Sequence, residues 1–330
     1  MIMPQRGRGI FGKGVSRATR NRRTPRMRGP QDLLLAALQT RWRVFLRQLG
    51  RCRLRCSEPA VHDLRVSTRR LIAALDLLAA VSPLSHAAKA RQQLKRLLKS
   101  MGPLRDAQVQ ILAARRLSNE FPEIEPLSTV LMLREQRALK RIAVRLGRVQ
   151  IRVLRQRVNA GIAHLRRLMR RASLASVLGL TLRGALAAEY VRVVQMRQQL
   201  DRHDPATIHR MRIAFKKFRY ATEVLRPDLE ARFHTAMNGL QNRMGDIHDL
   251  EVFRSSVREF AVQRRGRSAT ALTRTPLGIT HRTRRSGRKP PVVVITKIER
   301  RLQNRHGYLV RRFYTSANEI FRFQELGSVG

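Results

Sequence analysis

The sequence has few cysteines, few acidic residues and few aromatic residues for its length. With two cysteines, 13 prolines and 19 glycines in 330 residues, it is neither a disulfide scaffold nor a collagen-like chain. Only 22 residues are acidic, against 69 Lys and Arg, and only 5% are aromatic. The scarcity of acids leaves a net charge of +47, which indicates a polyanionic partner: nucleic acid, polyphosphate or an anionic membrane surface.

The two cysteines, Cys52 and Cys56, lie four residues apart and would share one face of a helix. We interpret them as ordinary helix residues in a reducing compartment. No second cysteine pair or adjacent histidine cluster is present to complete a metal site. The sequence therefore predicts no metal and no cofactor.

Long apolar runs are also missing. The longest uncharged runs, such as Leu77–Ala88, extend for about a dozen residues, whereas a membrane span needs roughly 20. We therefore expect no membrane span. The N-terminal segment is basic and glycine-rich but lacks the apolar stretch of a secretory signal. A mitochondrial presequence is a weaker alternative, because glycines would interrupt its helix, so we expect a cytoplasmic protein.

The charge is not confined to tails. Residues 1–30 and 264–290 each contain nine Lys and Arg and no acid, a composition that predicts disordered basic segments. The remaining 273 residues still carry 51 basic residues against 22 acidic ones, a net charge of +29. The folded part is therefore strongly basic itself. With 43% hydrophobic residues, it has enough apolar material for a core.

Between these segments the sequence is typical of an all-α protein, because Leu, Ala, Arg and Gln dominate and no alternating strand pattern appears. Val292–Ile295 is a β-branched run, but it is isolated. We expect breaks at prolines and glycines, among them Gly179 and Gly245. The predicted helices span residues 31–50, 59–80, 84–101, 104–118, 127–147, 150–171, 180–201, 205–226, 228–244, 247–263 and 295–322.

An internal repeat carries the functional signal. Residues 62–70 and 209–217 both match the pattern H-x-x-R-[VI]-x-x-[RK]-[RK], 147 positions apart. About 40 residues after each copy, M-G-P-L-R-D at 101–106 corresponds to M-G-D-I-H-D at 244–249, 143 positions apart. Two motifs in the same order at nearly the same offset predict duplicated halves.

Helical spacing places His62, Arg65 and Arg69 on one face of a helix, opposite a stripe of leucines. The second copy places His209 with its own cations in the same way. A charged helix face is ordinarily just solvated, but acids are absent from both of these faces. The chain has 60 Arg and nine Lys, and four of the lysines lie in or just before the motifs. Because the ammonium group is a compact point charge, this placement favours phosphate contacts.

These paired motifs resemble the CHAD family, named for a conserved histidine α-helical domain. The resemblance covers most of 31–322. It implies two four-helix bundles related by a pseudo-twofold axis, with half one at about 31–178 and half two at about 179–322. The basic insertion 264–290 interrupts the second half, and 323–330 form a tail. It further implies a positively charged channel that binds inorganic polyphosphate, and association with polyphosphate granules.

Carried over by position, the resemblance predicts a polyphosphate-binding set from both halves. The first half contributes His62, Arg65, Arg69, Arg70, Lys95 and Lys99, and the second contributes His209, Arg212, Lys216, Lys217, Arg219, Tyr220 and Arg243. The family often has a further Arg after the paired bases. The second copy has it as Arg219, whereas the first copy has Ile72, so we expect the first half to bind more weakly.

Four further expectations follow from these motifs. Histidines among cations should be neutral without ligand and protonated beside a bound polyanion, so binding should tighten as the pH falls from about 7.5 toward 6. The alternative to this electrostatic role is that His62 and His209 each donate only a structural hydrogen bond. We expect Asp106 and Asp249 to cap the starts of helices, with orientation of a channel arginine as the alternative. Gly102 and Gly245 should end the preceding helices.

An enzyme is not expected. Glu123-Ile124-Glu125 begins like the E-x-E-x-K signature of triphosphatases, but Leu127 occupies the lysine position. Phosphoryl hydrolysis also needs carboxylates that hold a metal near the substrate, and the motif faces offer cations only. Nonspecific binding of RNA or DNA is the main alternative function, although aromatic residues for base stacking are few. A scaffold with a protein partner is a third class of function.

Overall fold

The computed structural model describes residues 29–83, 85–272 and 292–328, and these residues form helices without strands. The α-helices are α1 (Pro30–Leu54), α2 (Glu58–Val81), α3 (Ser85–Ser100), α4 (Gly102–Ser118), α5 (Glu125–Gly147), α6 (Ile151–Met169), α7 (Ala172–Gln198), α8 (Pro205–Leu225), α9 (Pro227–Leu272), α10 (Val292–Ser316) and α11 (Gln324–Gly327). Two short 3₁₀ helices, η1 (Pro122–Ile124) and η2 (Ala317–Phe323), complete them. The all-α prediction is confirmed for the described part of the chain.

Prolines mark the helix starts where we expected breaks. Proline occupies one of the first two positions in α1, α2, α4, α5 and α8, and α9 begins at Pro227. Its missing N–H has no helical partner at these positions, and its fixed φ suits the first turn. At α8 the side chain of Asp204 adds a cap by accepting a hydrogen bond from the Ala206 N–H at 2.9 Å.

Two glycines predicted as breaks lie inside helices instead. Gly179 is within α7, which begins at Ala172 rather than at residue 180, and Gly245 is within α9, which merges two predicted helices. The prediction was wrong at both positions because glycine costs a helix only about 1 kcal/mol and keeps its N–H, so packing overrides it. Gly102 does not end a helix either, since it is the first residue of α4.

The basic insertion is partly helical. α9 continues to Leu272 and therefore includes residues 264–272, which we had predicted to be disordered. The isolated run Val292–Ile295 forms the first turn of α10, which then gives way to η2 at Ala317. Residues 1–28, 273–291 and 329–330 lie outside the described residues, so the predictions for the N-terminal tail and for the rest of the insertion concern undescribed segments. The predicted C-terminal tail at 323–330 was wrong for its described part, because Phe323 and Leu326 are apolar and fully buried and residues 324–327 form α11.

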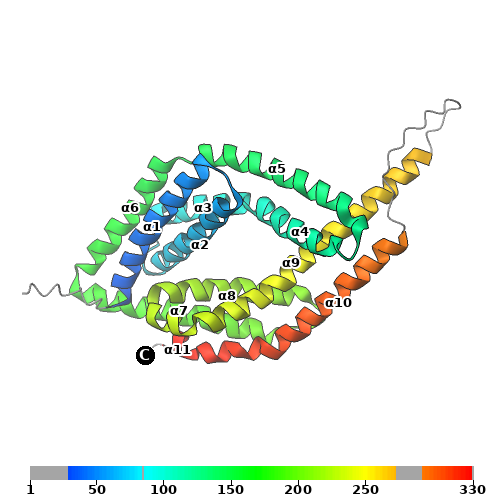
Figure 1. Cartoon of the computed structure of the whole chain (residues 1–330). Helices are drawn as coiled ribbons and strands as arrows, with labels where there is room; N and C mark the ends of the chain where they lie inside the picture. The colour runs from blue at the N-terminus through cyan, green and yellow to red at the C-terminus, as the bar shows by residue number, and fades with distance from the viewer. Residues whose placement is uncertain (1–28, 84, 273–291, 329–330) are drawn as a thin grey trace, which may run out of the picture.

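The helices pack in two connected groups (Figure 1). α1, α2, α3 and α6 contact one another in sequence, as do α7, α8, α9 and α10, while the α4–α5 hairpin packs onto α9 through α4. The larger apolar core runs through both groups and contains Phe45, Phe215 and Phe218. A smaller apolar core lies between α4, α5, α9 and α10. Since one core spans both groups, a division into two pseudo-twofold-related four-helix bundles stays a prediction. The motif helices α2 and α8 contact each other at the centre.

One helix bears on the membrane question. The α7 segment Ser173–Gln198 is long and apolar enough to cross a membrane by length and composition, with a mean hydropathy of 1.3. A count of uncharged residues overlooked it because Arg183, Glu189 and Arg192 interrupt the segment. A core helix of a soluble protein passes the same test, so the absence of a membrane span stays a prediction.

Candidate anion-binding site

A cavity of about 560 Å³ lies between the two motif helices and collects cations from both copies. We call it the central cavity. Six of the residues predicted to bind polyphosphate line it: Arg69, Lys95, Arg212, Lys216, Lys217 and Tyr220. They come from α2, α3 and α8, and α7 closes the cavity with Ala185 and Glu189. Arg91, which the motifs did not mark, adds a sixth cation but pairs with Asp76.

Lys216 has the most perturbed charge in the central cavity. Burial is the main cause that lowers its pKa to about 7, and Arg212 and Arg69 lower it further, whereas Asp249 opposes the shift. An ammonium group in such a place has few water molecules and several like charges around it. A bound anion would relieve both costs, so the arrangement favours anions over an empty site.

Arg65 lies behind the cavity wall rather than in it. It is 8% exposed, its guanidinium donates to the Leu98 carbonyl at 3.5 Å, and burial lowers its pKa to about 10. Its charge still acts on Lys216, whose pKa it helps to lower. Arg65 therefore contributes to the positive potential of the cavity without lining it.

Asp106 and Asp249 face this cationic centre and do not cap helices. Asp106 is the fifth residue of α4 and Asp249 lies in the middle of α9, so the predicted capping role was wrong because the helices begin earlier. Burial raises the pKa of Asp106, and nearby Arg65 opposes that shift. Asp249 raises the pKa of Arg212 and of Lys216. The charges of the two acids therefore partly offset the positive charge of the cluster.

His209 contacts a second histidine beside the cations. The ring centroids of His209 and His248 are 4.9 Å apart, and burial followed by the charge of Arg212 lowers the pKa of both. We had not counted His248 as a site residue. The signal was the second motif, where His248 occupies the position that Arg105 has in the first copy. His209 does not line the central cavity, although the charges of two residues that do, Arg212 and Lys216, lower its pKa.

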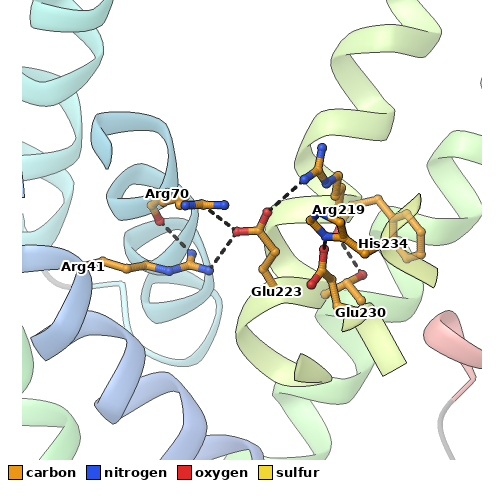
Figure 2. Close-up of polar contacts among 8 residues, drawn as sticks. Arg41, Arg70, Arg219, Glu223, Glu230 and His234 are labelled. Atoms are coloured by element: carbon orange, nitrogen blue, oxygen red, sulfur yellow. Dashed lines mark hydrogen bonds and ion pairs between the residues drawn. The ribbon is translucent and has the colours of Figure 1, made fainter. Parts of the chain in front are cut away.

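Two of the predicted residues, Arg70 and Arg219, are held by a carboxylate instead (Figure 2). Glu223 accepts from Arg70 at 3.0 Å and lies 3.5 Å from Arg41 and 3.6 Å from Arg219. Arg41 also donates to the Arg70 carbonyl at 2.8 Å. Figure 2 shows Glu223 between the guanidinium groups of α1 and α2 on one side and α8 on the other. We call these four residues the Glu223 cluster.

The Glu223 cluster corrects the predicted position of both arginines. Neither arginine lines the central cavity. Arg70 lies on the flank of α2, and the side chain of Arg219 is buried, with 6% of its surface exposed. The sequence did contain one hint, because Arg219 and Glu223 are four residues apart on α8, the spacing of a helical ion pair. Arg41 on α1 lies outside both motifs, so the motif comparison did not find it.

The remaining predicted residues lie apart from the central cavity. His62 is exposed and lines a separate cavity of about 470 Å³ together with Arg70 and Asp63. Lys99 is exposed and lines neither cavity. Arg243 pairs with Glu319 of η2 at 2.5 Å and does not line the central cavity.

Within residues 29–83, 85–272 and 292–328, no three His, Cys, Asp or Glu side chains are grouped so that they could hold a metal ion. Cys52 and Cys56 are free thiols with Sγ atoms 4.0 Å apart. Burial is the main cause that raises the pKa of Cys52 to about 12, which keeps the thiol protonated. Both residues fit the structural role that the sequence predicts.

The comparisons with known proteins agree with the motifs. The family model for the CHAD domain matches residues 36–258, about two thirds of the chain. The chain belongs to the CHAD family. Among solved structures, the CHAD domain from the plant Ricinus communis has a TM-score of 0.62 at 18% identity, covering 88% of this chain and 92% of that one. PptA from Streptomyces chartreusis has a TM-score of 0.58 at 17% identity, covering 89% and 99%.

No curated protein matches this CHAD chain in sequence. At 17% and 18% identity the two solved structures show that the helical fold is shared. They do not show what this chain binds.

Proposed function

We propose that this CHAD protein binds inorganic polyphosphate in the central cavity. One observation carries the proposal: cations of both motif copies, Arg69 and Lys95 from the first and Arg212, Lys216 and Lys217 from the second, line a single cavity. Polyphosphate carries roughly one negative charge per phosphate and has no bases to read. Recognition then needs only guanidinium forks and ammonium groups at the phosphate oxygens.

We further propose that the two motif copies are duplicated halves related by a pseudo-twofold axis. In support, residues at equivalent positions act on one another across the centre. Arg69 of the first copy lowers the pKa of Lys216, its equivalent in the second, and Asp249 raises the pKa of Asp106, its equivalent in the first. A repeated phosphate chain suits a site with repeated cations.

We propose that the protein is a binder and not an enzyme, located in the cytoplasm and associated with polyphosphate granules. Of the two acids in the cavity wall, Asp76 pairs with Arg91, which leaves Glu189 alone to serve a metal or a water nucleophile. One carboxylate is a poor basis for metal-assisted phosphoryl transfer. Incubation with polyphosphate and Mg²⁺ should release no orthophosphate. Co-purification with granules should be lost after treatment with a polyphosphatase.

The function is tested by competition at physiological salt. Labelled long-chain polyphosphate is bound to the full chain and challenged with RNA, duplex DNA and orthophosphate at equal phosphate concentration. We expect unlabelled polyphosphate alone to displace the label efficiently, because the cavity lining offers cations but only one aromatic ring, Tyr220, for base stacking, and a single orthophosphate cannot contact both halves. Displacement by RNA or DNA at equal concentration would replace the proposed function with nonspecific nucleic-acid binding.

The location of the site is tested by two variants of equal charge. Arg69→Ala with Lys216→Ala removes one cavity cation from each motif copy. Arg137→Ala with Lys140→Ala removes the same charge from exposed positions on α5. We expect the cavity variant to weaken binding about tenfold or more and the α5 variant to change it by less than about threefold. If deletion of residues 1–28 has the larger effect, the site lies on the tail.

A further inference from the structure

The central cavity has an apolar wall that a phosphate chain does not use. Half of its lining residues are Ala, Ile or Leu. Along α2 the cavity meets Arg69 first and then Ile72, Ala73, Leu77 and Ala80. Cations therefore lie at one end of this helix face and apolar side chains at the other. The apolar part runs from Ile72 to Ala80, interrupted by Asp76, and spans eight helical steps or about 12 Å.

The two motif copies differ where the apolar wall begins on α2. At the positions 147 residues later, where the first copy has Ile72 and Ala73, the second has Arg219 and Tyr220. The apolar wall thus lies on α2, opposite the cations of α8. Ile213 adds an exposed apolar side chain from α8 at the rim of the cavity. A site for inorganic polyphosphate alone would gain nothing from this asymmetry.

We propose that the central cavity accepts an anionic amphiphile, a phosphate ester whose head group binds Arg69, Arg212 and Lys216 and whose alkyl chain lies along Ile72 and Leu77. The charges support the head group: six cations line the cavity against Asp76, which Arg91 neutralises, and Glu189. The size also fits, since ligand sites in proteins range over about 300–1,000 Å³ and are mostly apolar with a few placed polar groups. Twelve ångströms accommodate an extended chain of about eight to ten carbons.

This inference rests on the anion binding proposed above, so one experiment measures both. Ethyl, butyl, hexyl and octyl phosphate, all below the concentration at which octyl phosphate forms micelles, are titrated directly into the full chain by calorimetry, and the binding of labelled polyphosphate is measured in parallel. The four esters share one head group and differ only in apolar length. A fully buried methylene raises affinity about fourfold. At half burial we expect octyl phosphate to bind roughly fifty-fold tighter than ethyl phosphate.

Three variants locate the effect. Ile72→Arg gives the first copy the residue that the second has as Arg219, and it should abolish the chain-length dependence while retaining polyphosphate binding. Because Ile72 is only 7% exposed, Ile213→Gln at an exposed position provides a second test that does not depend on repacking. It should reduce the octyl preference several-fold. Val191→Gln, an exposed apolar position of α7 outside the cavity lining, is the matched control and should leave that preference unchanged.

The outcomes separate the two proposals. If polyphosphate binds and octyl phosphate is no tighter than ethyl phosphate, the apolar wall is not a subsite and this inference is overturned, while the proposed function stands. If octyl phosphate is preferred but polyphosphate does not bind, the proposed function falls and this one stands. An octyl preference that Val191→Gln reduces as much as Ile213→Gln would reveal nonspecific detergent binding and would also overturn the inference.

The source of the amphiphile is distinguished by a second arm. Phosphatidylcholine vesicles with and without phosphatidic acid are sedimented with the wild-type protein and the Ile213→Gln variant. Reduced sedimentation of the variant on phosphatidic acid vesicles would identify a lipid head group that enters the cavity. Equal sedimentation, together with the loss of octyl phosphate preference, would identify a soluble phosphate ester.

Discussion

The pH dependence of polyphosphate binding should be set by Lys216 and not by the histidines. Its pKa of about 7 in the free protein comes mainly from burial and then from Arg212 and Arg69. A phosphate in contact with the ammonium would raise that pKa toward its ordinary value near 10.4. The bound state then carries one more proton than the free state above pH 7. The affinity should be fully present below pH 7 and fall as the pH rises toward the bound-state pKa.

The magnitude follows from this linkage. Above pH 7 the affinity should fall about tenfold per pH unit, and it should be roughly 100-fold weaker at pH 9 than at pH 6. His209 and His248 do not line the central cavity, so a bound phosphate chain should change their protonation less than that of Lys216. Arg65 retains most of its charge at pH 9, since its pKa is about 10.

The assay is a titration of labelled long-chain polyphosphate at fixed ionic strength between pH 6 and pH 9. Lys216→Arg should remove the fall in affinity above pH 7, because a guanidinium keeps its proton in this range. Lys217→Arg, at the exposed neighbouring position in the same cavity, is the control and should keep the wild-type profile. A wild-type affinity that varies by less than about threefold between pH 7 and pH 9 would refute the reasoning.

Three further predictions concern stability and reactivity. Glu223→Gln leaves the largely buried Arg41 and Arg219, and the exposed Arg70, without their acid, so we expect the free energy of unfolding in urea to fall by about 3 kcal/mol. The control Asp63→Asn breaks an exposed pair with Arg51 and should cost less than about 1 kcal/mol. Gly184→Ala should raise the free energy of unfolding by about 0.5–1 kcal/mol, because a Cβ there meets no atom within 4 Å. Cys52, with its pKa raised to about 12 mainly by burial, should resist iodoacetamide at pH 8 until the protein is unfolded; rapid native alkylation would contradict that assignment.

The sequence predicted the helices well where proline interrupts the pattern and poorly where glycine does. Pro83, Pro103, Pro205 and Pro227 all lie at helix ends or starts, because a missing N–H and a fixed φ cannot be compensated in the middle of a helix. The cost of glycine is small enough for the surrounding packing to outweigh it, as Gly245 shows within α9. Composition alone therefore could not show that α9 is one helix.

The motif spacing found the residues that share a helix face but not those that another element redirects. Arg69, Arg212 and Lys216 line the central cavity because the motif repeats every three to four residues and one face of each helix meets the other. Arg70 lies one residue beyond that face, where Arg41 of α1 and Glu223 of α8 are its partners. No single-helix pattern contains that information, because the partners lie 29 and 153 residues away.

The few acids explain why so much positive charge can gather at the centre. Glu223 neutralises part of three arginines from α1, α2 and α8, and Asp249 partly offsets the repulsion on Lys216 and Arg212. These acids lie outside the lining of the central cavity, so they offset repulsion in the fold without occupying the cavity's own cations. The cations that line the cavity keep an excess that only an added anion can balance. The distribution of 22 acids therefore defines the site as much as the 69 bases do.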